Sequence, residues 1–284
     1  MLVLAEIYCY TIYMIIGVDI VGTKTLLAVF TQSSKLLKEV RFETNRDYDQ
    51  FLIDLKKHAD SLETSKAKIA CAAVPGLIDR KRGVVESLGN LPWKDKHIKH
   101  DISVALGIKN VYIENDSKLA GLGEVRRLGK DYRRVYYITL STGIGGTLLI
   151  NGKIAQEVIN GEVGMVPMLH EGKIVRWEDF ASGRAFFEKY GKKAVDVDDA
   201  IIWEDFAQNI GLGLAMICCI YQVEAIIFGG GLGQHIEKFQ DYLRPYVSTY
   251  LHTTIKQPEA LLKAQYGDES VIYGCYEYAK DHLA

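Results

Sequence analysis

Residues that could bind a phosphate follow a short apolar run near the start of the chain. The run MIIGVD ends in Asp19, and a turn with Gly22, Thr23 and Lys24 follows it. Glycine lets a phosphate approach the backbone because no Cβ blocks it, and exposed N–H groups in such a turn bind anions. The Asp19 carboxylate suits Mg²⁺ held through water, because this ion keeps much of its hydration shell. An ordinary tight hairpin with a surface lysine explains the same residues equally well.

Two further glycine-rich segments follow apolar runs later in the chain. The turn STGIGG, residues 141–146, combines hydroxyls with glycines and suits a β/γ-phosphate, although it lacks the Walker pattern. A turn that only connects two strands is the alternative. The segment GGGLG, residues 229–233, is predicted to form a turn between the strand AIIF and a helix expected from about His235. A dinucleotide-binding motif needs an acidic residue about twenty positions on, which this chain lacks, so we interpret the segment as a slot for a purine or its ribose.

Three acidic residues lie where they could contact a substrate. Asp116 follows the strand NVYI in the segment END and could accept a proton from a substrate hydroxyl. Capping of the following helix is the competing explanation, and the local sequence favours it. Glu162 in GEVG and Glu178 in WED could bind the hydroxyls of a sugar, since carboxylates accept such hydrogen bonds in pairs. A solvated surface glutamate is the alternative for each.

The elements that must position these residues alternate between strands and helices. Short apolar runs predict strands near residues 14–19, 25–30, 36–44, 69–74 and 110–116, and the helical spacing of Phe51, Leu55, Ala59 and Leu62 predicts a helix between the third and fourth. Segment 15–30 and segment 136–150 both read strand, glycine-rich turn, strand, which indicates an internal repeat. We therefore predict an α/β fold with two halves that meet near Asp116, and a ligand site in the cleft between them.

Composition limits the function classes that remain. The 284 residues include 34 basic and 36 acidic ones, so the net charge of −2 argues against nucleic-acid binding. Five cysteines without a C-x-x-C pair predict buried free thiols in a reducing cytoplasm. The apolar first residues lack the basic region and cleavage site of a signal peptide, and they are too short to span a membrane. We expect Met14 to begin the functional protein and residues 1–13 to be an extension without a structural role.

Taken in order, six segments give the chain a resemblance to a known family. They are GVDIVGTK, VPGLID with GVVESLGNLPW, ENDSKLAGLGE, TLSTGIGGTLLING, GEVG and IIFGGGLG. This ordered set resembles the ROK family of sugar kinases and sugar-responsive repressors, from about Met14 to the C-terminus. The resemblance implies a two-domain actin/hexokinase-like (ribonuclease H-like) α/β fold with a central cleft. Its domains would span residues 14–116 and 117–284, and the C-terminal helix could pack back on the first.

The resemblance also implies an ATP-dependent kinase that phosphorylates the 6-hydroxyl of a hexose or an N-acetylhexosamine. Glucose and N-acetylmannosamine are the expected substrates. The repressor branch carries an N-terminal helix-turn-helix domain, and only thirteen residues precede the first expected strand here, so the resemblance implies the kinase branch. Asp116 matches the general base. The residues that match sugar contacts are Asn90, Asn115, Glu162 and Glu178. Those that match the nucleotide side are Asp19, Gly22, Thr23, Lys24, Thr142, Gly143, Gly229, Gly230 and Gly231. A homodimer is expected from the resemblance alone.

The chain departs from the family pattern where members hold a structural zinc. Met165 occupies the position of a ligating histidine, and HEGKIVRWEDFASG replaces a cysteine cluster. Without thiolates or that imidazole a zinc site of the usual type cannot form, so we predict no zinc. Two other functions stay open. A sugar-binding sensor without turnover would not need Asp116 and the phosphate turns, and a dinucleotide-dependent oxidoreductase is disfavoured by the missing acidic residue.

Overall fold

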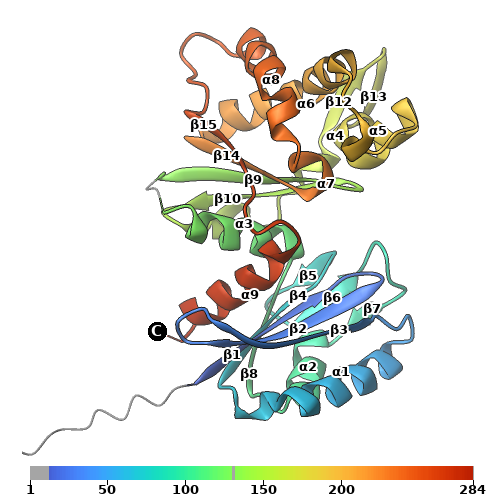
Figure 1. The fold of residues 1–284 in the computed structure, drawn as a ribbon, viewed down its shortest axis with the longest axis vertical. Coiled ribbons are helices and arrows are strands. Elements are labelled where there is room, and N and C mark those ends of the chain that lie inside the picture. The colour runs from blue at the N-terminus through green and yellow to red at the C-terminus, as the bar shows by residue number, and fades with distance from the viewer. Residues whose placement is uncertain (1–12, 130–131, 284) are drawn as a thin grey trace, which may run out of the picture. The chain divides into compact units, whose positions relative to one another are not determined.

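A computed structural model describes residues 13–129 and 132–283 of the chain (Figure 1). The chain divides into two compact units. The first runs to Glu114 and takes in the last residues from Tyr278, and the second is Asn115–Glu277. The domain limits expected from the sequence stay a prediction. Apart from Tyr13, the extension expected for residues 1–13 lies outside the described residues.

The first unit is built on a five-stranded mixed sheet. Its strand order is β3-β2-β1-β4-β8, with β1, β2 and β3 antiparallel and β4 and β8 parallel to β1. Strands β1 and β2 are almost wholly buried, whereas the edge strand β3 alternates and carries charged side chains, which protects the open edge of the sheet. These strands are β1 (Met14–Ile20), β2 (Lys24–Thr31), β3 (Leu36–Glu43), β4 (Ile69–Ala73) and β8 (Asn110–Glu114).

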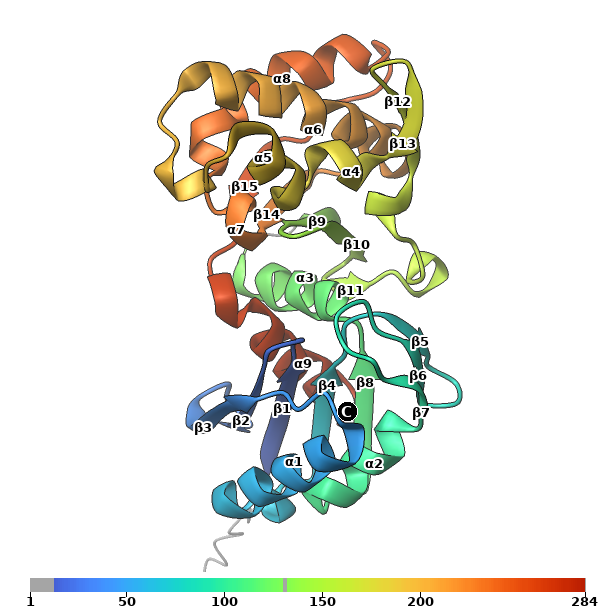
Figure 2. The same ribbon diagram turned by 90° about the vertical axis from the view of Figure 1, so that its right-hand side faces the viewer.

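Helices α1 (Tyr48–Leu62) and α2 (Ile98–Leu106) lie side by side on one face of this sheet (Figure 2). Val111 and Ile113 of β8 face the same apolar core as these helices. Because alternate residues of a strand point to opposite faces, Tyr112 points the other way. There its ring lies 4.1 Å from that of His282 and 6.3 Å from that of Tyr278, so the end of α9 (Ser270–Asp281) covers the second face.

The second unit repeats the strand arrangement of the first. Its sheet has the order β11-β10-β9-β14-β15, with an antiparallel hairpin of β9 and β10 and with β14 and β15 parallel to β9. Both hairpins pair over seven residues in register. The internal repeat predicted from the glycine-rich turns is thereby confirmed. These strands are β9 (Arg134–Leu140), β10 (Ile144–Ile150), β11 (Lys153–Ile154), β14 (Ala225–Gly229) and β15 (Ala260–Lys263).

The helices of the second unit build a separate apolar core. Helices α6 and α8 pack side by side (Figure 2), and the aromatic side chains of Trp203, Phe206 and Phe239 join them. Helix α6 presents Cys218 to the core and Cys219 to solvent, because neighbouring residues on a helix point about 100° apart. The prediction of buried thiols is therefore wrong for Cys219. The helices are α3 (Asp116–Arg127), α4 (Trp177–Ala181), α5 (Gly183–Tyr190), α6 (Ala200–Tyr221), α7 (Gly230–Gly233) and α8 (Ile236–Tyr250).

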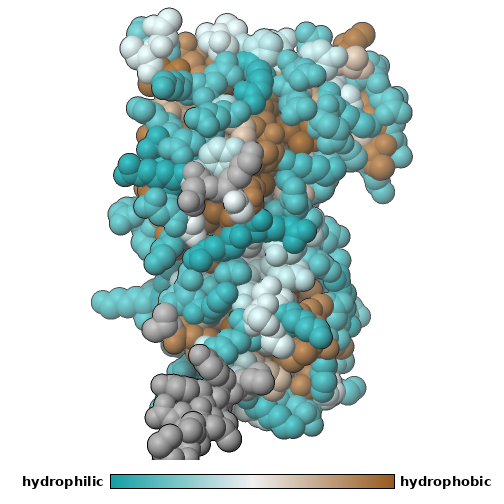
Figure 3. Space-filling model, turned by 60° about the vertical axis from the view of Figure 1, so that its left-hand side comes forward, coloured by the Kyte–Doolittle hydropathy of each residue, from teal (hydrophilic) through white to brown (hydrophobic). Residues whose placement is uncertain are grey.

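Two small sheets complete the units. Hydrophilic side chains cover most of the surface seen in Figure 3. Within residues 13–129 and 132–283, no helix is both long and apolar enough to cross a membrane. The small sheets consist of β5 (Leu77–Asp79), β6 (Val84–Ser87) and β7 (Lys94–Lys96) in the first unit, and β12 (Pro167–His170) and β13 (Lys173–Arg176) in the second.

Candidate active site

The turn between β1 and β2 brings two classes of predicted site residue together. Asp19 is buried near the end of β1, where it is flanked by β2 and β4. A Cβ on Gly22 would lie 2.8 Å from the Cβ of Asn90, so a larger residue at this position would displace its neighbour. The fold therefore places Asn90, a predicted sugar contact, against the predicted phosphate turn.

The remaining residues of this turn face solvent. The Val21 amide donates to the Lys24 carbonyl oxygen over 3.0 Å, and the Thr44 amide donates to the Thr23 carbonyl oxygen over 3.2 Å. Thr23, Lys24 and Val21 are exposed. The turn thus presents a hydroxyl and an ammonium group, both of which bind phosphate oxygens well.

The segment Glu114-Asn115-Asp116 joins β8 to α3, and each of its three residues makes different contacts. Glu114 is fully buried and accepts hydrogen bonds of 2.6 and 2.5 Å from the Arg80 guanidinium. Asn115 caps α3, because its Oδ1 accepts from the Ser117 amide over 3.1 Å and from the Ser117 hydroxyl over 2.7 Å. Capping, the favoured alternative for Asp116, therefore belongs mainly to Asn115, and Asp116 is the first residue of the helix.

Arg80 is expected to stabilise the first unit through this bidentate contact. Because Arg80→Met leaves a fully buried carboxylate without its guanidinium, it should lower the free energy of unfolding by about 2–3 kcal/mol. Arg82 is the matched control, since it lies 3.9 Å from Asp79 and is mostly exposed, so Arg82→Met should cost less than about 0.5 kcal/mol. Urea denaturation of both variants measures this difference, and equal midpoints would contradict it.

The Asp116 carboxylate is a better proton acceptor in this position than an ordinary aspartate. Burial raises its pKa above the ordinary aspartate range, because desolvation disfavours the charged form. The Ser117 amide, which donates to Asp116 Oδ1 over 2.8 Å, and the positive charge of Lys118 act in the opposite direction, whereas Glu162 adds to the increase. A general base works best when its pKa lies close to the operating pH, so this shift favours proton transfer.

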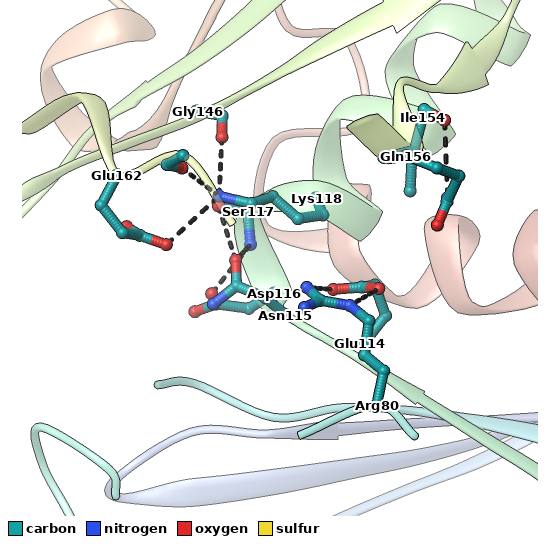
Figure 4. Close-up of polar contacts among 11 residues, drawn as sticks. Arg80, Glu114, Asn115, Asp116, Ser117, Lys118, Gly146, Ile154, Gln156 and Glu162 are labelled. Carbon is teal, nitrogen blue, oxygen red and sulfur yellow. Dashed lines mark hydrogen bonds and ion pairs between the residues drawn. The ribbon is translucent and has the colours of Figure 1, made fainter. Parts of the chain in front are cut away.

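Glu162 is exposed, and its carboxylate lies 3.4 Å from the buried Lys118 ammonium (Figure 4). Lys118 also donates to the Gly146 carbonyl oxygen over 2.9 Å and to the Gly161 carbonyl oxygen over 3.1 Å. The structure therefore brings Glu162 to the first turn of the helix that carries Asp116. Sequence reasoning missed Lys118, whose one signal is its place two residues after Asp116 in a helix of small and apolar residues.

The second glycine segment is shorter than predicted. The turn covers only residues 141–143, closed by the Ser141 amide donating to the Gly143 carbonyl oxygen over 3.0 Å, and β10 begins at Ile144. The prediction that Gly145 and Gly146 belong to the turn is wrong. A Cβ on Gly146 would lie 2.7 Å from the Tyr136 ring, so this glycine serves close packing within the sheet.

Glu178 lies directly behind this second turn. Its Oε2 accepts a hydrogen bond from the Ile144 amide over 3.2 Å, and a Cβ on Gly143 would come within 2.5 Å of the same oxygen. Gly164 is confined in the same way, because its Cβ would lie 2.2 Å from the Ile144 carbonyl oxygen. The structure therefore brings together Glu178, a predicted sugar contact, with Gly143 and the GEVG segment.

The third glycine segment forms a short helix, not the turn that the sequence predicts. Gly229 ends β14, and Gly230 has a φ of +75° that favours glycine. A Cβ on Gly230 would also lie 2.6 Å from the Leu140 carbonyl oxygen, next to the second turn. The chain can then enter helix α7 at once, and the glycines place its backbone beside Leu140.

One cavity of about 550 Å³ in the second unit joins these two glycine segments. Thr142 of the turn and Gly231 of α7 both line it, and a Cβ on Gly231 would enter open space. Burial lowers the pKa of His235, another lining residue, so its ring is neutral near pH 7. The charged side chains that line the cavity are Arg184, Lys192 and Lys193.

Comparison with known proteins decides the family. The ROK family matches residues 15–282. This chain belongs to the ROK family. Glucokinase of Streptomyces coelicolor is 24% identical over 94% of this chain and 97% of its own length, and N-acetyl-D-glucosamine kinase of Haemophilus influenzae is 27% identical over 91% and 96%. The xylose repressor of Bacillus subtilis is 25% identical over 74% of this chain and 60% of its own length.

The fold agrees with this assignment. The ROK glucokinase of Streptomyces griseus, solved with glucose and AMPPNP, superimposes with a TM-score of 0.75 at 23% identity, over 95% of this chain and 99% of its own. The predicted actin/hexokinase-like α/β fold is thereby confirmed. The family itself includes both sugar kinases and repressors, so membership alone leaves the activity of this ROK chain to be argued from its residues.

In this ROK chain the segment that replaces the cysteine cluster begins at the last residue of β12 and continues through β13 and helix α4. Met165 is exposed, and the Arg176 guanidinium lies 3.8 Å from its sulfur. Over the part of the chain that the structure describes, no group of three histidine, cysteine or acidic side chains is arranged to hold a metal ion. The expectation that the chain lacks zinc stays a prediction, which metal analysis of the purified protein tests.

Proposed function

We propose that this ROK chain is an ATP-dependent sugar kinase that transfers the γ-phosphate to the 6-hydroxyl of a hexose or an N-acetylhexosamine. Glucose and N-acetylmannosamine are the first substrates to test. The glucokinase and N-acetyl-D-glucosamine kinase relatives support this class of reaction. The homodimer expected from the family resemblance belongs to the same proposal.

The observation that carries the proposal is the 550 Å³ cavity of the second unit. It joins Thr142 and Gly231, two residues assigned to the nucleotide on separate motifs, and its rim includes the cations Arg184, Lys192 and Lys193. Cationic side chains and a hydroxyl suit phosphate oxygens, and an adjoining apolar space suits a purine. A sensor that only binds sugar has no use for such a cavity.

Asp19 and the first glycine turn fit a hydrated magnesium ion. Asp19 supplies one buried carboxylate near the end of β1, and the following turn carries the exposed Thr23 and Lys24. Mg²⁺ is commonly bound by one or two carboxylates together with substrate phosphates and water, so this donor set is sufficient. When bound, the ion would neutralise charge on the transferred phosphate.

Asp116 is the residue that we propose as general base. Its carboxylate would accept the proton of the sugar 6-hydroxyl as that oxygen attacks the γ-phosphorus and the bond to the β-phosphate oxygen breaks. Glu162, held beside Asp116 by Lys118, and Glu178, behind the second turn, are the proposed acceptors for sugar hydroxyls, together with Asn90 and Asn115. Phosphoryl transfer depends mostly on such positioning and on charge neutralisation.

Sugar-dependent ADP release tests the proposal directly. The protein is assayed with Mg²⁺-ATP across glucose, mannose, fructose, glucosamine, N-acetylglucosamine and N-acetylmannosamine, with an ATP-only blank. We expect turnover on at least one sugar, and NMR of the product should place the phosphate on the 6-oxygen. Sugar binding without ADP release on any of the six would overturn the kinase and favour a sensor.

Substitution of Gly231 tests the nucleotide cavity. Because a side chain here would enter open space in the cavity, Gly231→Leu should fold normally and compete with the nucleotide for volume. We expect the KM for ATP to rise at least about 10-fold, which corresponds to about 1.4 kcal/mol of lost binding. The KM for the sugar is the internal control and should change less than about twofold. An unchanged KM for ATP would remove this cavity from nucleotide binding.

A further inference from the structure

Lys118 is a buried lysine whose ammonium group is fully occupied by acceptors. The residue is 1% exposed, and lysine is almost never buried to this extent unless it is paired. Its Nζ lies 2.9 Å from the Gly146 carbonyl oxygen, 3.1 Å from that of Gly161 and 3.4 Å from Glu162 Oε1. An ammonium group has three N–H donors, so each of these acceptors can be served.

Close packing of α3 on β10 explains why this lysine extends where it does. A Cβ on Gly121 of α3 would lie 2.5 Å from the Thr147 side chain, and one on Gly145 of β10 would lie 3.1 Å from the Ser117 side chain. The two elements therefore approach each other without intervening side chains on either side of Lys118. The Lys118 side chain extends along this contact, and its ammonium group ends at the β10 backbone.

The three acceptors come from two separate parts of the chain. Gly146 belongs to β10, whereas Gly161 and Glu162 lie in an exposed segment before the short helical turn 163–165. Figure 4 shows the Lys118 side chain reaching from α3 toward Gly146 and Glu162. One charged group thus connects the helix that carries Asp116, the strand that follows the second turn, and the segment that carries Glu162.

We propose that Lys118 is a positioning residue of the active site: its ammonium holds Glu162 and the Gly161–Glu162 backbone beside α3 and balances the negative charge of Glu162 and Asp116. This inference rests on the proposed function, because it assigns a purpose to the site in which Asp116 is the base. A purely structural role would anchor the loop equally well, but loss of Lys118 would then lower stability without changing the sugar KM or the pH dependence of turnover.

The effect of the Lys118 charge on Asp116 distinguishes a positioning role from a purely structural one. The positive charge of Lys118 lowers the pKa of Asp116 and the negative charge of Glu162 raises it, against the larger upward effect of burial. From the neighbouring strand β9, Tyr137 interacts with Asp116 and Tyr136 interacts with Glu162, and burial raises the pKa of both phenols, so they stay neutral at physiological pH. Removing the Lys118 charge should therefore raise the pKa of Asp116, and removing that of Glu162 should lower it.

Three variants test the proposal by steady-state kinetics between pH 5 and 9. Lys118→Met should raise the sugar KM at least about 10-fold, which corresponds to about 1.4 kcal/mol of lost binding, and move the acidic limb of kcat/KM to higher pH. Lys118→Arg keeps the charge in a different shape, so it should raise the sugar KM while leaving the limb in place. Glu162→Gln should move the limb to lower pH.

A measurement without turnover keeps the inference separate from the proposed function. Carbon-13 NMR of aspartate-labelled protein, with the Asp116 signal assigned through Asp116→Asn, reports the titration of this carboxyl directly. If the wild type turns over no sugar, the kinase proposal fails, while the Asp116 titration still tests Lys118. Unchanged titration in Lys118→Met would overturn the inference, as would a sugar KM within twofold of the wild type. If Lys118→Met does not fold, Lys118→Arg and Glu162→Gln decide in the same assays.

Discussion

Replacing Asp116 with asparagine should reduce the kcat for sugar-dependent ADP release by about 10²- to 10⁴-fold, the range that general-base catalysis contributes. Asparagine keeps the size of the side chain and retains an oxygen that can accept the Ser117 amide. The KM for the sugar should therefore change little, and the loss should fall on the chemical step.

The same substitution should raise thermal stability near neutral pH. Burial raises the pKa of Asp116 above its unfolded value, so the ionised carboxylate costs stability above the folded pKa. This cost decreases as the pH falls below the folded pKa and is gone below the unfolded pKa. Asparagine removes the cost. We expect Asp116→Asn to melt at a higher temperature than the wild type at pH 7.5, with a smaller difference at pH 5.

Asp49 provides the matched control for both measurements. It is an exposed aspartate in the first turn of α1, as Asp116 is in the first turn of α3. Asp49→Asn should leave kcat within about twofold and the melting temperature nearly unchanged, because surface substitutions typically alter stability by less than about 0.5 kcal/mol. An Asp116→Asn enzyme that keeps most of its activity would remove Asp116 from the proposed mechanism.

Adding a methyl group at Gly274 should cause a large loss of stability. Gly274 lies in α9, and a Cβ there would be 1.9 Å from the Leu119 carbonyl oxygen in α3. The obstacle is backbone, which cannot rotate away as a side chain can, so the two helices must separate. We expect Gly274→Ala to lower the free energy of unfolding by about 3 kcal/mol or more, in the range of severe overpacking. This outweighs the roughly 1 kcal/mol that alanine gains over glycine in a helix.

Gly89→Ala controls for the chemical change itself. No atom lies within 4 Å of the Cβ that this substitution would add, and Gly89 does not have a positive φ. Its midpoint in urea should match the wild type within about 0.5 kcal/mol, whereas Gly274→Ala should unfold at a clearly lower urea concentration. Equal midpoints for the two variants would show that α3 and α9 can separate without cost, contrary to the packing seen here.

The regular elements were accessible from local patterns. The apolar spacing around Phe51 predicts the helix that forms at Tyr48–Leu62, and the short branched runs predict β1, β2, β4 and β8. The repeated strand–turn–strand pattern predicts two similar hairpins, which the register of both sheets confirms. These features follow from periodicity within a few consecutive residues. The family is predicted from the order of six motifs along the chain.

The roles of individual glycines could not be read in the same way. Gly143, Gly145 and Gly146 look alike in the sequence, yet Gly143 borders the Glu178 carboxylate, whereas Gly145 and Gly146 of β10 pack against Ser117 of α3 and Tyr136 of β9. Gly230 adopts a positive φ beside Leu140, whereas a Cβ on Gly231 would enter open space. The sequence shows only that these positions have no side chain. The atoms that would clash with an added Cβ belong to residues elsewhere in the chain.

The sequence by itself determined the α/β class, the repeated hairpins, the ROK family and the candidate residues on each motif. Only the tertiary structure decided that Asn115 caps α3, that Thr142 and Gly231 line one cavity, and that Lys118 reaches Gly161 and Glu162 more than forty positions away. Local patterns encode elements because backbone geometry repeats over a few residues. Burial and charge balance arise from side chains that are far apart in the sequence and meet only in the fold. They determine the pKa of Asp116 and the contacts of Lys118.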